Sequence, residues 1–327
     1  MIVRRDRMID NLRQNEEEYQ INRRQKKPPM GNRAKTFLNS KKVAPYVFVS
    51  PFIISFLILT LYPTIQAFIM SFQSILPGQV TFIGFQNYER IFNPVFFKAL
   101  TNTTIYTIAT VVILVAIPLV LATLLDSKFV KFKKIFRSAL FIPSLTSVVV
   151  AGIIFRLFFS ESDSSIANQI IGVFGFEPVS WRYSGWSGLL LMILIASWRW
   201  MGVNILYFLA GLQNISKELY ESAEIDGANV FQKFRYITLP SLKPIIIFVT
   251  TISIIGGFRV FEESYVLWES NSPGNIGLTL VGYLYQQGIQ QNDMGFGAAV
   301  GVIVLLIIFA ASILYLLSTG AFKRGDE

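Results

Sequence analysis

The sequence predicts an all-α, polytopic membrane protein with six transmembrane helices. Of its 327 residues, 53% are hydrophobic, and the mean hydropathy is +0.51. The apolar residues come in long blocks, and about 20 consecutive apolar residues are enough to cross a bilayer as a helix. The basic residues fall mainly between alternate blocks, which is typical of a protein that crosses a membrane several times.

Six apolar segments meet this length, and a polar segment separates each from the next. They cover residues 44–72, 104–125, 139–159, 186–212, 245–268 and 296–317. We therefore expect one transmembrane domain over 44–322. A basic tail over 1–43, expected to be disordered, precedes it, and a short tail over 323–327 follows it.

The positions of Lys and Arg orient these helices. Twenty-three of the 29 lie in segments on one side, and three, Arg90, Lys98 and Arg182, lie on the other. Loops rich in Lys and Arg stay in the cytosol, so both termini and the loop after the fourth helix are expected there. This topology accounts for the net charge of +9, and no nucleic-acid partner is expected. Contact of the tail with anionic lipid headgroups is left open.

Missing residue types and motifs exclude several kinds of chemistry. The chain has no cysteine and no histidine, which removes disulfides, thiolate metal sites and histidine general bases. It also lacks the G-x-x-x-x-G-K-[ST] phosphate-binding loop. We therefore expect no catalytic residues, no metal and no cofactor in this chain, and no ATP hydrolysis of its own.

A polar, helix-prone segment over 216–244 interrupts the apolar pattern. Ser216 can cap a helix that begins at Lys217, and Gly227 stands where that helix must stop and turn. A second short helix is expected from Asn229 to about Tyr236, and an ion pair is expected between Lys217 and Glu221. The segment is either a folded docking element or an amphipathic linker on the bilayer surface.

The order of residues in this segment carries a resemblance. Glu221-Ser222-Ala223, Asp226-Gly227-Ala228 and Ile237-Thr238-Leu239-Pro240 resemble the EAA loop of ABC importer permeases of the carbohydrate (maltose-type, binding-protein-dependent) branch. The resemblance implies two coupling helices that dock on a cytosolic ATPase. The residues implied to dock are Glu221, Ser222, Ala223, Asp226, Gly227, Ala228, Leu239 and Pro240.

The resemblance extends over 44–322. It includes APYVFVSPFIISFLILTLYP from residue 44, and it comes nearest to arabinose and arabino-oligosaccharide permeases of Gram-positive bacteria at 70–78 and 197–213. It implies a sugar importer in the bacterial cytoplasmic membrane. The implied partners are a second permease in a heterodimer, two cytosolic ATPase subunits that bind ATP, an extracytoplasmic sugar-binding protein and membrane lipid.

Ionisable and polar residues within the expected spans are candidates for a substrate path, because such residues usually face a cavity or a partner. The candidates are Asn204, Tyr207, Arg259, Glu262, Glu263 and Tyr265. Carboxylates accept hydrogen bonds from sugar hydroxyls, and aromatic rings cover the apolar faces of sugars. Arg259 and Glu263, four apart on one helix, are expected to pair. A purely structural ion pair is the alternative.

Two further cations, Arg156 and Arg199, are interpreted as interfacial residues that extend toward the headgroups. Two rival functions also remain. An ABC permease for a non-sugar solute shares every feature except the finer resemblance. A proton-coupled secondary transporter would use Glu262 or Glu263 and would work without partners.

Overall fold

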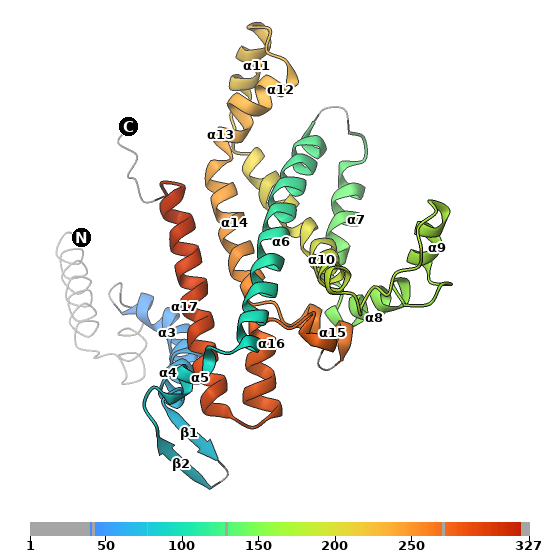
Figure 1. Ribbon diagram of the computed structural model, residues 1–327. Coiled ribbons are helices and arrows are strands. Elements are labelled where there is room, and N and C mark those ends of the chain that lie inside the picture. Colours follow the sequence, from blue (N-terminus) through green and yellow to red (C-terminus); the bar gives the residue numbers. More distant parts are fainter. Residues whose placement is uncertain (1–39, 41–42, 77, 128–129, 270–271, 322–327) are drawn as a thin grey trace, which may run out of the picture. The chain divides into compact units, whose positions relative to one another are not determined.

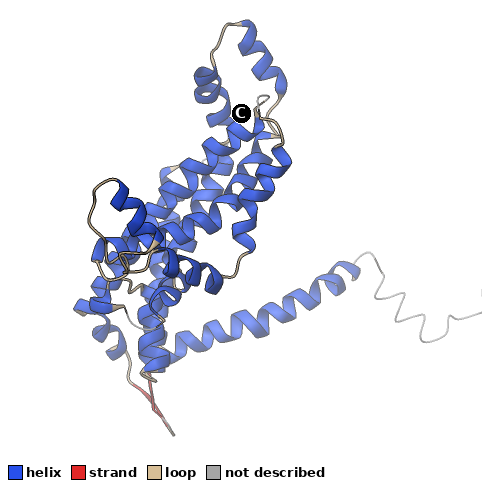
Figure 2. Cartoon of the chain, turned by 90° about the vertical axis from the view of Figure 1, so that its right-hand side faces the viewer, coloured by secondary structure: helices blue, strands red, loops and turns tan. Residues whose placement is uncertain are grey.

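The computed structural model describes residues 40, 43–76, 78–127, 130–269 and 272–321. The tail predicted over 1–43 lies almost entirely outside these residues, and the tail over 323–327 lies wholly outside them. The chain divides into two compact units, 1–66 and 67–327. The described residues are overwhelmingly helical (Figure 2), and the predicted all-α class is confirmed.

The first apolar block forms one long helix. α3 (Ala44–Phe56) continues through a π-helical turn (Leu57–Leu61) into α4 (Tyr62–Met70). Together these make an apolar helix of 27 residues, long enough to span a bilayer. Pro45 lies in the first turn of α3, where its missing N–H breaks no helical hydrogen bond.

Three long helices, α6 (Pro94–Asp126), α10 (Gly185–Leu212) and α17 (Met294–Ser318), form the frame of the second unit (Figure 1). α6 packs against α10 and also against α14 (Lys243–Phe258), which in turn packs against α17. Asn93 caps α6 by accepting hydrogen bonds from the backbone N–H groups of Val95 and Phe96. Each long helix is apolar enough to cross a membrane.

The third apolar block is bent, although the sequence suggested a single span over 139–159. α7 (Lys133–Leu145) and α8 (Val148–Phe158) meet at 97°. A second bend, of 67°, separates the helical segment Val230–Ser241 from α14. In the described part of the chain, four helices are long and apolar enough to span a membrane, or up to six if each bent pair is one span.

The fifth apolar block is also interrupted, so the continuous helix predicted over 245–268 is wrong. α14 ends at Phe258, and α15 (Glu262–Trp268) starts after three non-helical residues. The hydroxyl of Thr279 donates to the carbonyl of Val260 at 2.8 Å, and this contact holds the break from 19 residues away. Local sequence could not reveal that partner.

Shorter elements complete the second unit. They are the antiparallel hairpin β1 (Gln73–Leu76) and β2 (Gln79–Phe82), α5 (Gln86–Ile91), α9 (Ile166–Val173), α11 (Lys217–Ile225), α12 (Val230–Lys233), a π-helical turn (Phe234–Thr238), α13 (Leu239–Ser241), a 3-10 turn (Pro273–Asn275), α16 (Leu280–Tyr285) and a π-helical turn (Gln286–Gln290). The segment over 84–100, between the first two apolar blocks, contains α5 and the start of α6.

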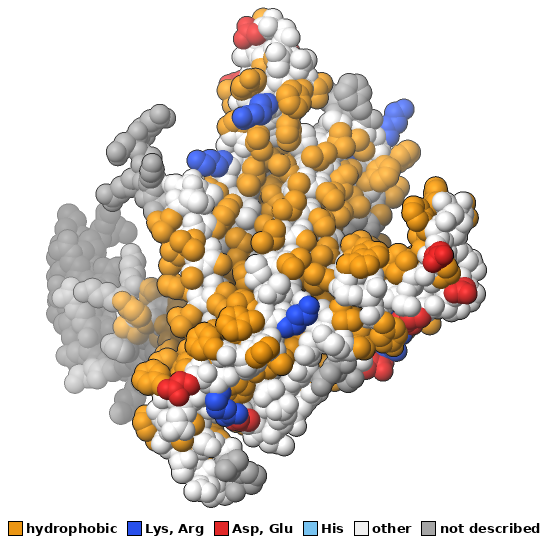
Figure 3. All heavy atoms as spheres, in the orientation of Figure 1, with side chains coloured by type: hydrophobic (Ala, Val, Ile, Leu, Met, Phe, Trp, Pro, Cys, Tyr) orange, Lys and Arg blue, Asp and Glu red, His pale blue; other side chains and the backbone are white. Residues whose placement is uncertain are grey.

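Short elements and connections gather at two opposite ends of the second unit. α11 and α12 lie at the same end as the connection between α6 and α7, and the hairpin and α16 lie at the other end (Figure 1). Hydrophobic side chains cover most of the middle of the face shown in Figure 3, over α6, α14 and α17. This arrangement suits a helical bundle with two polar ends and an apolar girdle.

Candidate functional site

A cavity of about 530 Å³ lies among α6, α10, α14 and the break before α15. This volume is in the range of small-molecule binding sites. Apolar residues make up much of the wall, and polar groups enter from every side. The polar and aromatic groups include Tyr106, Thr110, Arg199, Trp200, Asn204, Tyr207, Ser253, Arg259, Phe261, Glu262 and Glu263.

Five of the six residues proposed for the substrate path line this cavity. α10 contributes Asn204 and Tyr207, and the α14–α15 junction contributes Arg259, Glu262 and Glu263. The sixth, Tyr265, lies outside it, beside a second and much smaller pocket where its ring contacts those of Phe261 and Tyr285. The fold thus brings residues about 60 positions apart to one wall.

Arg199 is the cation that the two carboxylates of α15 share. Its Nη1 atom lies 3.3 Å from Oε1 of Glu263 and 3.8 Å from Oε2 of Glu262. The interfacial position expected for Arg199 is wrong, because its side chain is only 11% exposed and turns inward. A cation near the middle of an apolar helix needs a buried partner. The central position of Arg199 in the apolar segment 186–212 could therefore have indicated an ion pair inside the bundle.

The expected pair between Arg259 and Glu263 is absent from the ion pairs of the described residues. The prediction of this pair assumed one unbroken helix. The break at 259–261 instead places Arg259 after the end of α14 and Glu263 in α15. Arg259 is exposed on the cavity wall. Arg156, the other cation expected at an interface, forms an ion pair with Glu269.

Asn204 joins two helices as well as lining the cavity. Its amide Nδ2 donates to the carbonyl of Leu114 in α6 at 2.8 Å, and the residue is buried. This is the interhelical hydrogen bond that typically orders polar groups in a membrane bundle. Tyr207 packs edge to face against Phe248 of α14, with the ring centroids 5.3 Å apart.

Side chains of α6 hold the irregular backbone that leads into α16. The Asn102 amide of α6 donates to the carbonyls of Asn275, Ile276 and Leu278 at 2.9, 3.1 and 3.0 Å. The hydroxyl of Thr103 accepts from the N–H of Leu280 at 2.9 Å. Irregular backbone inside a bundle needs such partners, and here α6 supplies them.

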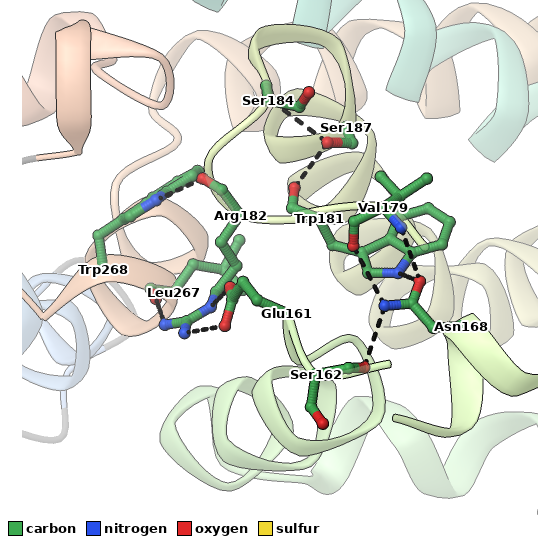
Figure 4. A network of polar contacts seen from close by, with 10 residues as sticks. All are labelled: Glu161, Ser162, Asn168, Val179, Trp181, Arg182, Ser184, Ser187, Leu267 and Trp268. Carbon is green, nitrogen blue, oxygen red and sulfur yellow. Dashed lines mark hydrogen bonds and ion pairs between the residues drawn. The ribbon is translucent and has the colours of Figure 1, made fainter. Parts of the chain in front are cut away.

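A polar network in the loop between α8 and α10 anchors the far end of α15 (Figure 4). Arg182 donates two hydrogen bonds to Glu161, at 2.7 and 2.8 Å, and its carbonyl accepts from the indole of Trp268 at 2.9 Å. Partial burial alone would raise the pKa of Glu161, but the hydrogen bond and charge of Arg182 outweigh burial and lower that pKa. The same pair raises the pKa of Arg182.

The polar segment after α10 folds as two short helices, as its sequence predicts. The Ser216 side chain caps α11 by accepting from the N–H of Glu218, and Gly227 adopts a left-handed φ of 78° where α11 ends. Asn229 begins α12 with a reciprocal capping box to Gln232. The chain then stays helical through Pro240, which lies in the first turn of α13.

Contacts between its two halves make this segment a folded unit. The Tyr220 hydroxyl is 2.8 Å from that of Thr238, and Lys233 pairs with Glu224 at 2.9 Å. The expected pair between Lys217 and Glu221 is not among the ion pairs of the described residues. The structure thus contains a folded element here and not a single surface helix.

The end of this folded unit carries exposed apolar side chains next to charged ones. Ile225 is 87% exposed, and Val230 and Phe231 are also well exposed. Among the residues that the resemblance assigns to docking, Glu221, Ser222, Asp226, Gly227 and Pro240 are exposed, and Ala223, Ala228 and Leu239 are half-buried. Exposed apolar groups with a charged rim are typical of an interaction surface.

The chain belongs to a known family of transport proteins. Residues 90–324 match the family described as the binding-protein-dependent transport system inner membrane component. The protein is therefore a membrane-embedded transport component, and the family resemblance read from its sequence is confirmed.

The chain is also similar in sequence to named permease proteins. The chain is 68% identical over 292 residues to the arabinooligosaccharides transport system permease protein AraP of Halalkalibacterium halodurans, covering 89% of this chain and 92% of the relative. It is 61% identical over 284 residues to the protein of that name from Bacillus subtilis, covering 87% and 91%.

Solved structures share the fold. A chain from the crystal structure of a bacterial ABC transporter involved in the import of the acidic polysaccharide alginate gives a TM-score of 0.76 at 24% identity. The likeness covers 90% of this chain and 100% of that one. At this identity it establishes the common fold alone.

Proposed function

We propose that this protein is one of two permease subunits of an ATP-driven ABC importer, with arabino-oligosaccharides as its substrates. The observation that carries the proposal is its 68% identity to an arabinooligosaccharide permease over 89% of the chain. The chemistry of the cavity supports it, because carboxylates and aromatic rings in a polar and apolar wall suit the hydroxyls and apolar faces of sugars.

The cavity is proposed to be this subunit's half of the translocation path. Glu262 is the carboxylate best placed to meet a solute, since 62% of its side chain is exposed. Asn204 and Tyr207 face the same space from α10, and the second permease of a heterodimer would supply the other wall. Tyr265 is proposed to act nearer the outer mouth, where its ring meets those of Phe261 and Tyr285.

The folded unit of α11 to α13 is proposed to dock on one of two cytosolic ATPase subunits. ATP would be bound and hydrolysed there, since this chain has no phosphate-binding loop. The exposed Ile225 and Phe231, beside Glu221 and Asp226, supply an apolar and acidic surface for that contact. Closure of the ATPase pair would move this unit and, through α14, the cavity wall.

The membrane orientation follows from the docking role. The end of the bundle with α11 and α12 would face the cytosol together with both termini, and the hairpin and the 160–185 loop would face outward. An extracytoplasmic sugar-binding protein would dock on that outer end. A related alginate importer has been crystallised in complex with a pentasaccharide-bound periplasmic protein, which supports such a partner by analogy.

Uptake by Glu262→Gln and Asn204→Ala variants tests the substrate path. We expect initial rates of arabinotriose uptake at least about tenfold below wild type at equal expression, because Glu262→Gln removes a charged hydrogen-bond acceptor from the cavity wall and Asn204→Ala removes a polar side chain. Thr101→Val, an exposed change at the outer part of α6, serves as the control and keeps the wild-type rate. Wild-type uptake in both cavity variants would refute this path.

A further inference from the structure

The corner where α6 ends and α7 begins is strongly basic. Its described cations are Lys131, Lys133, Lys134 and Arg137, and none of them forms an ion pair with another described residue. Even when the nearby Asp126 is counted, three positive charges remain in excess. The described part of this chain therefore leaves the charge of the corner without a partner.

Two of these cations lie on the side of α7 that packs against the bundle. Lys133 and Arg137 are half-buried and one helical turn apart, and Leu140 on the same side meets Gly202 of α10. The Nζ atom of Lys133 donates to the carbonyl of Asp126 at 2.7 Å, which ties it to the end of α6. The Nε atom of Arg137 is buried and has no hydrogen-bond partner in the described part of the chain. An anion at this position would give the Arg137 guanidinium the acceptor that it lacks.

Large apolar side chains flank the cations. Phe132, Ile135 and Phe136 are 73%, 64% and 51% exposed. Ile142, two turns after Ile135 and on the same face of α7, is exposed as well. In a membrane-embedded protein, an exposed apolar stripe of this kind faces lipid chains. The corner thus combines a cluster of cations with a stripe that suits acyl chains.

We infer that this corner is a binding site for one anionic phospholipid. The lipid phosphate accepts hydrogen bonds from Arg137 and Lys133, and the acyl chains lie along the exposed stripe of α7. A free phosphate ion would use the cations alone, whereas a lipid uses both parts of the corner. The proposed orientation places the site in the cytosolic leaflet. This role involves neither the sugar nor the ATPase, so it goes beyond the proposed function.

Native mass spectrometry of the purified importer, with both permeases and both ATPases, tests the site. The detergent-solubilised importer is titrated with dioleoylphosphatidylglycerol, and the apparent dissociation constant of the first bound lipid is measured. In the double variant Lys133→Gln with Arg137→Gln, we expect this constant to rise about tenfold, because the charge-assisted hydrogen bonds to the phosphate are lost. Dioleoylphosphatidylcholine has the same chains and no net charge, and it should bind the wild type and this variant equally weakly.

A second double variant tests the apolar half of the site. Ile135→Ser with Phe136→Ser keeps every cation and should also weaken binding of dioleoylphosphatidylglycerol, since the contacts with the acyl chains are lost. Lys98→Gln is the control, because it removes one exposed cation at the outer part of α6 and should leave the constant at its wild-type value.

Two results would overturn the inference. One is wild-type affinity for dioleoylphosphatidylglycerol in both double variants. The other is displacement of the lipid by inorganic phosphate at equal concentration, which would assign the corner to a free anion. ATP-driven uptake of arabinotriose by the wild-type importer is measured in parallel. Its absence would contradict the proposed function and leave the lipid site standing.

Discussion

Gly202 marks the closest approach of α10 to α7. A Cβ atom at this position would overlap the backbone carbonyl of Leu140, which no rotamer change can relieve. We expect Gly202→Ala to lower the free energy of unfolding by about 1–3 kcal/mol, the usual cost of overpacking. Thermal unfolding of the solubilised chain measures it. Gly172→Ala in α9, where a Cβ meets nothing within 4 Å, is the control, and equal losses in both would contradict this packing.

The Glu161–Arg182 pair makes the loop between α8 and α10 sensitive to acid. The folded-state pKa of Glu161 is lowered, so its stabilising effect is complete above the unfolded value of about 4.3 and is lost as pH falls through the folded-state pKa. Hydrogen exchange of the 160–185 loop, followed from about pH 6 to about pH 3, should accelerate across that window. Glu161→Gln should remove that acid-dependent step, and an unchanged pH profile in the variant would refute the pairing.

At the residue scale, the sequence identified the groups of the cavity better than their partners. Glu262, Glu263, Arg259, Asn204 and Tyr207 all line it. The pairing of Glu263 with Arg199 could not be predicted. The two residues lie 64 positions apart, and they meet only because α10 packs against α15. The spacing predicted an ion pair for Glu263 and none for Glu262; in the structure Glu263 is indeed buried in an ion pair, but its partner is Arg199 and not Arg259.

At the scale of elements, the turn between α11 and α12 depends on the backbone of Gly227. Its φ of 78° is left-handed, and an added Cβ atom would meet no atom within 4 Å. The backbone conformation, and not a lack of space, therefore restricts which residue type fits at this position. Gly227→Val should cost at least about 1–2 kcal/mol and reduce co-purification of the ATPase and coupled ATP hydrolysis. Gly227→Asn, which tolerates this conformation, should retain both, and equal behaviour of the two variants would contradict a conformational role.

The segment that returns before α16 depends on Asn102. Asn102→Leu leaves three backbone carbonyls without their donor and should destabilise the chain by about 2–3 kcal/mol. The unfolding midpoint of the solubilised protein measures this. Thr101→Val provides the neighbouring control, since the Thr101 hydroxyl bonds only within its own helix, to Phe97. A midpoint for Asn102→Leu equal to that of the control would show that the segment is held by other contacts.

Sequence predicted the elements well where the local pattern decides them. Ser216 caps the N-terminus of α11 and Asn229 that of α12, as their residue types indicate. Gly227 ends α11 with its left-handed backbone. The break in the fifth apolar block could not be predicted, because a tertiary partner holds it. Thr279 fixes the break at 259–261, and nothing in the apolar run before it marks that contact.

At the scale of the whole molecule, the cavity is proposed to be half of a transport path. α14 directly joins the cavity wall to the proposed docking unit, α11 to α13, because it starts at Lys243 beside α13 and ends at the cavity. The predicted limits of the transmembrane domain, 44–322, and the cytosolic position of both termini remain predictions. The link from docking unit to cavity is the central claim.

ATP-driven uptake by the reconstituted importer tests that claim most directly. Proteoliposomes would hold this chain with its partner permease and ATPase, and labelled arabinotriose would be supplied on its binding protein. We predict uptake that requires ATP, persists when the proton gradient is collapsed, and falls in Gly227→Val. Uptake by this chain alone, driven only by a proton gradient, would contradict the account and place Glu262 and Glu263 at the centre of a secondary transporter.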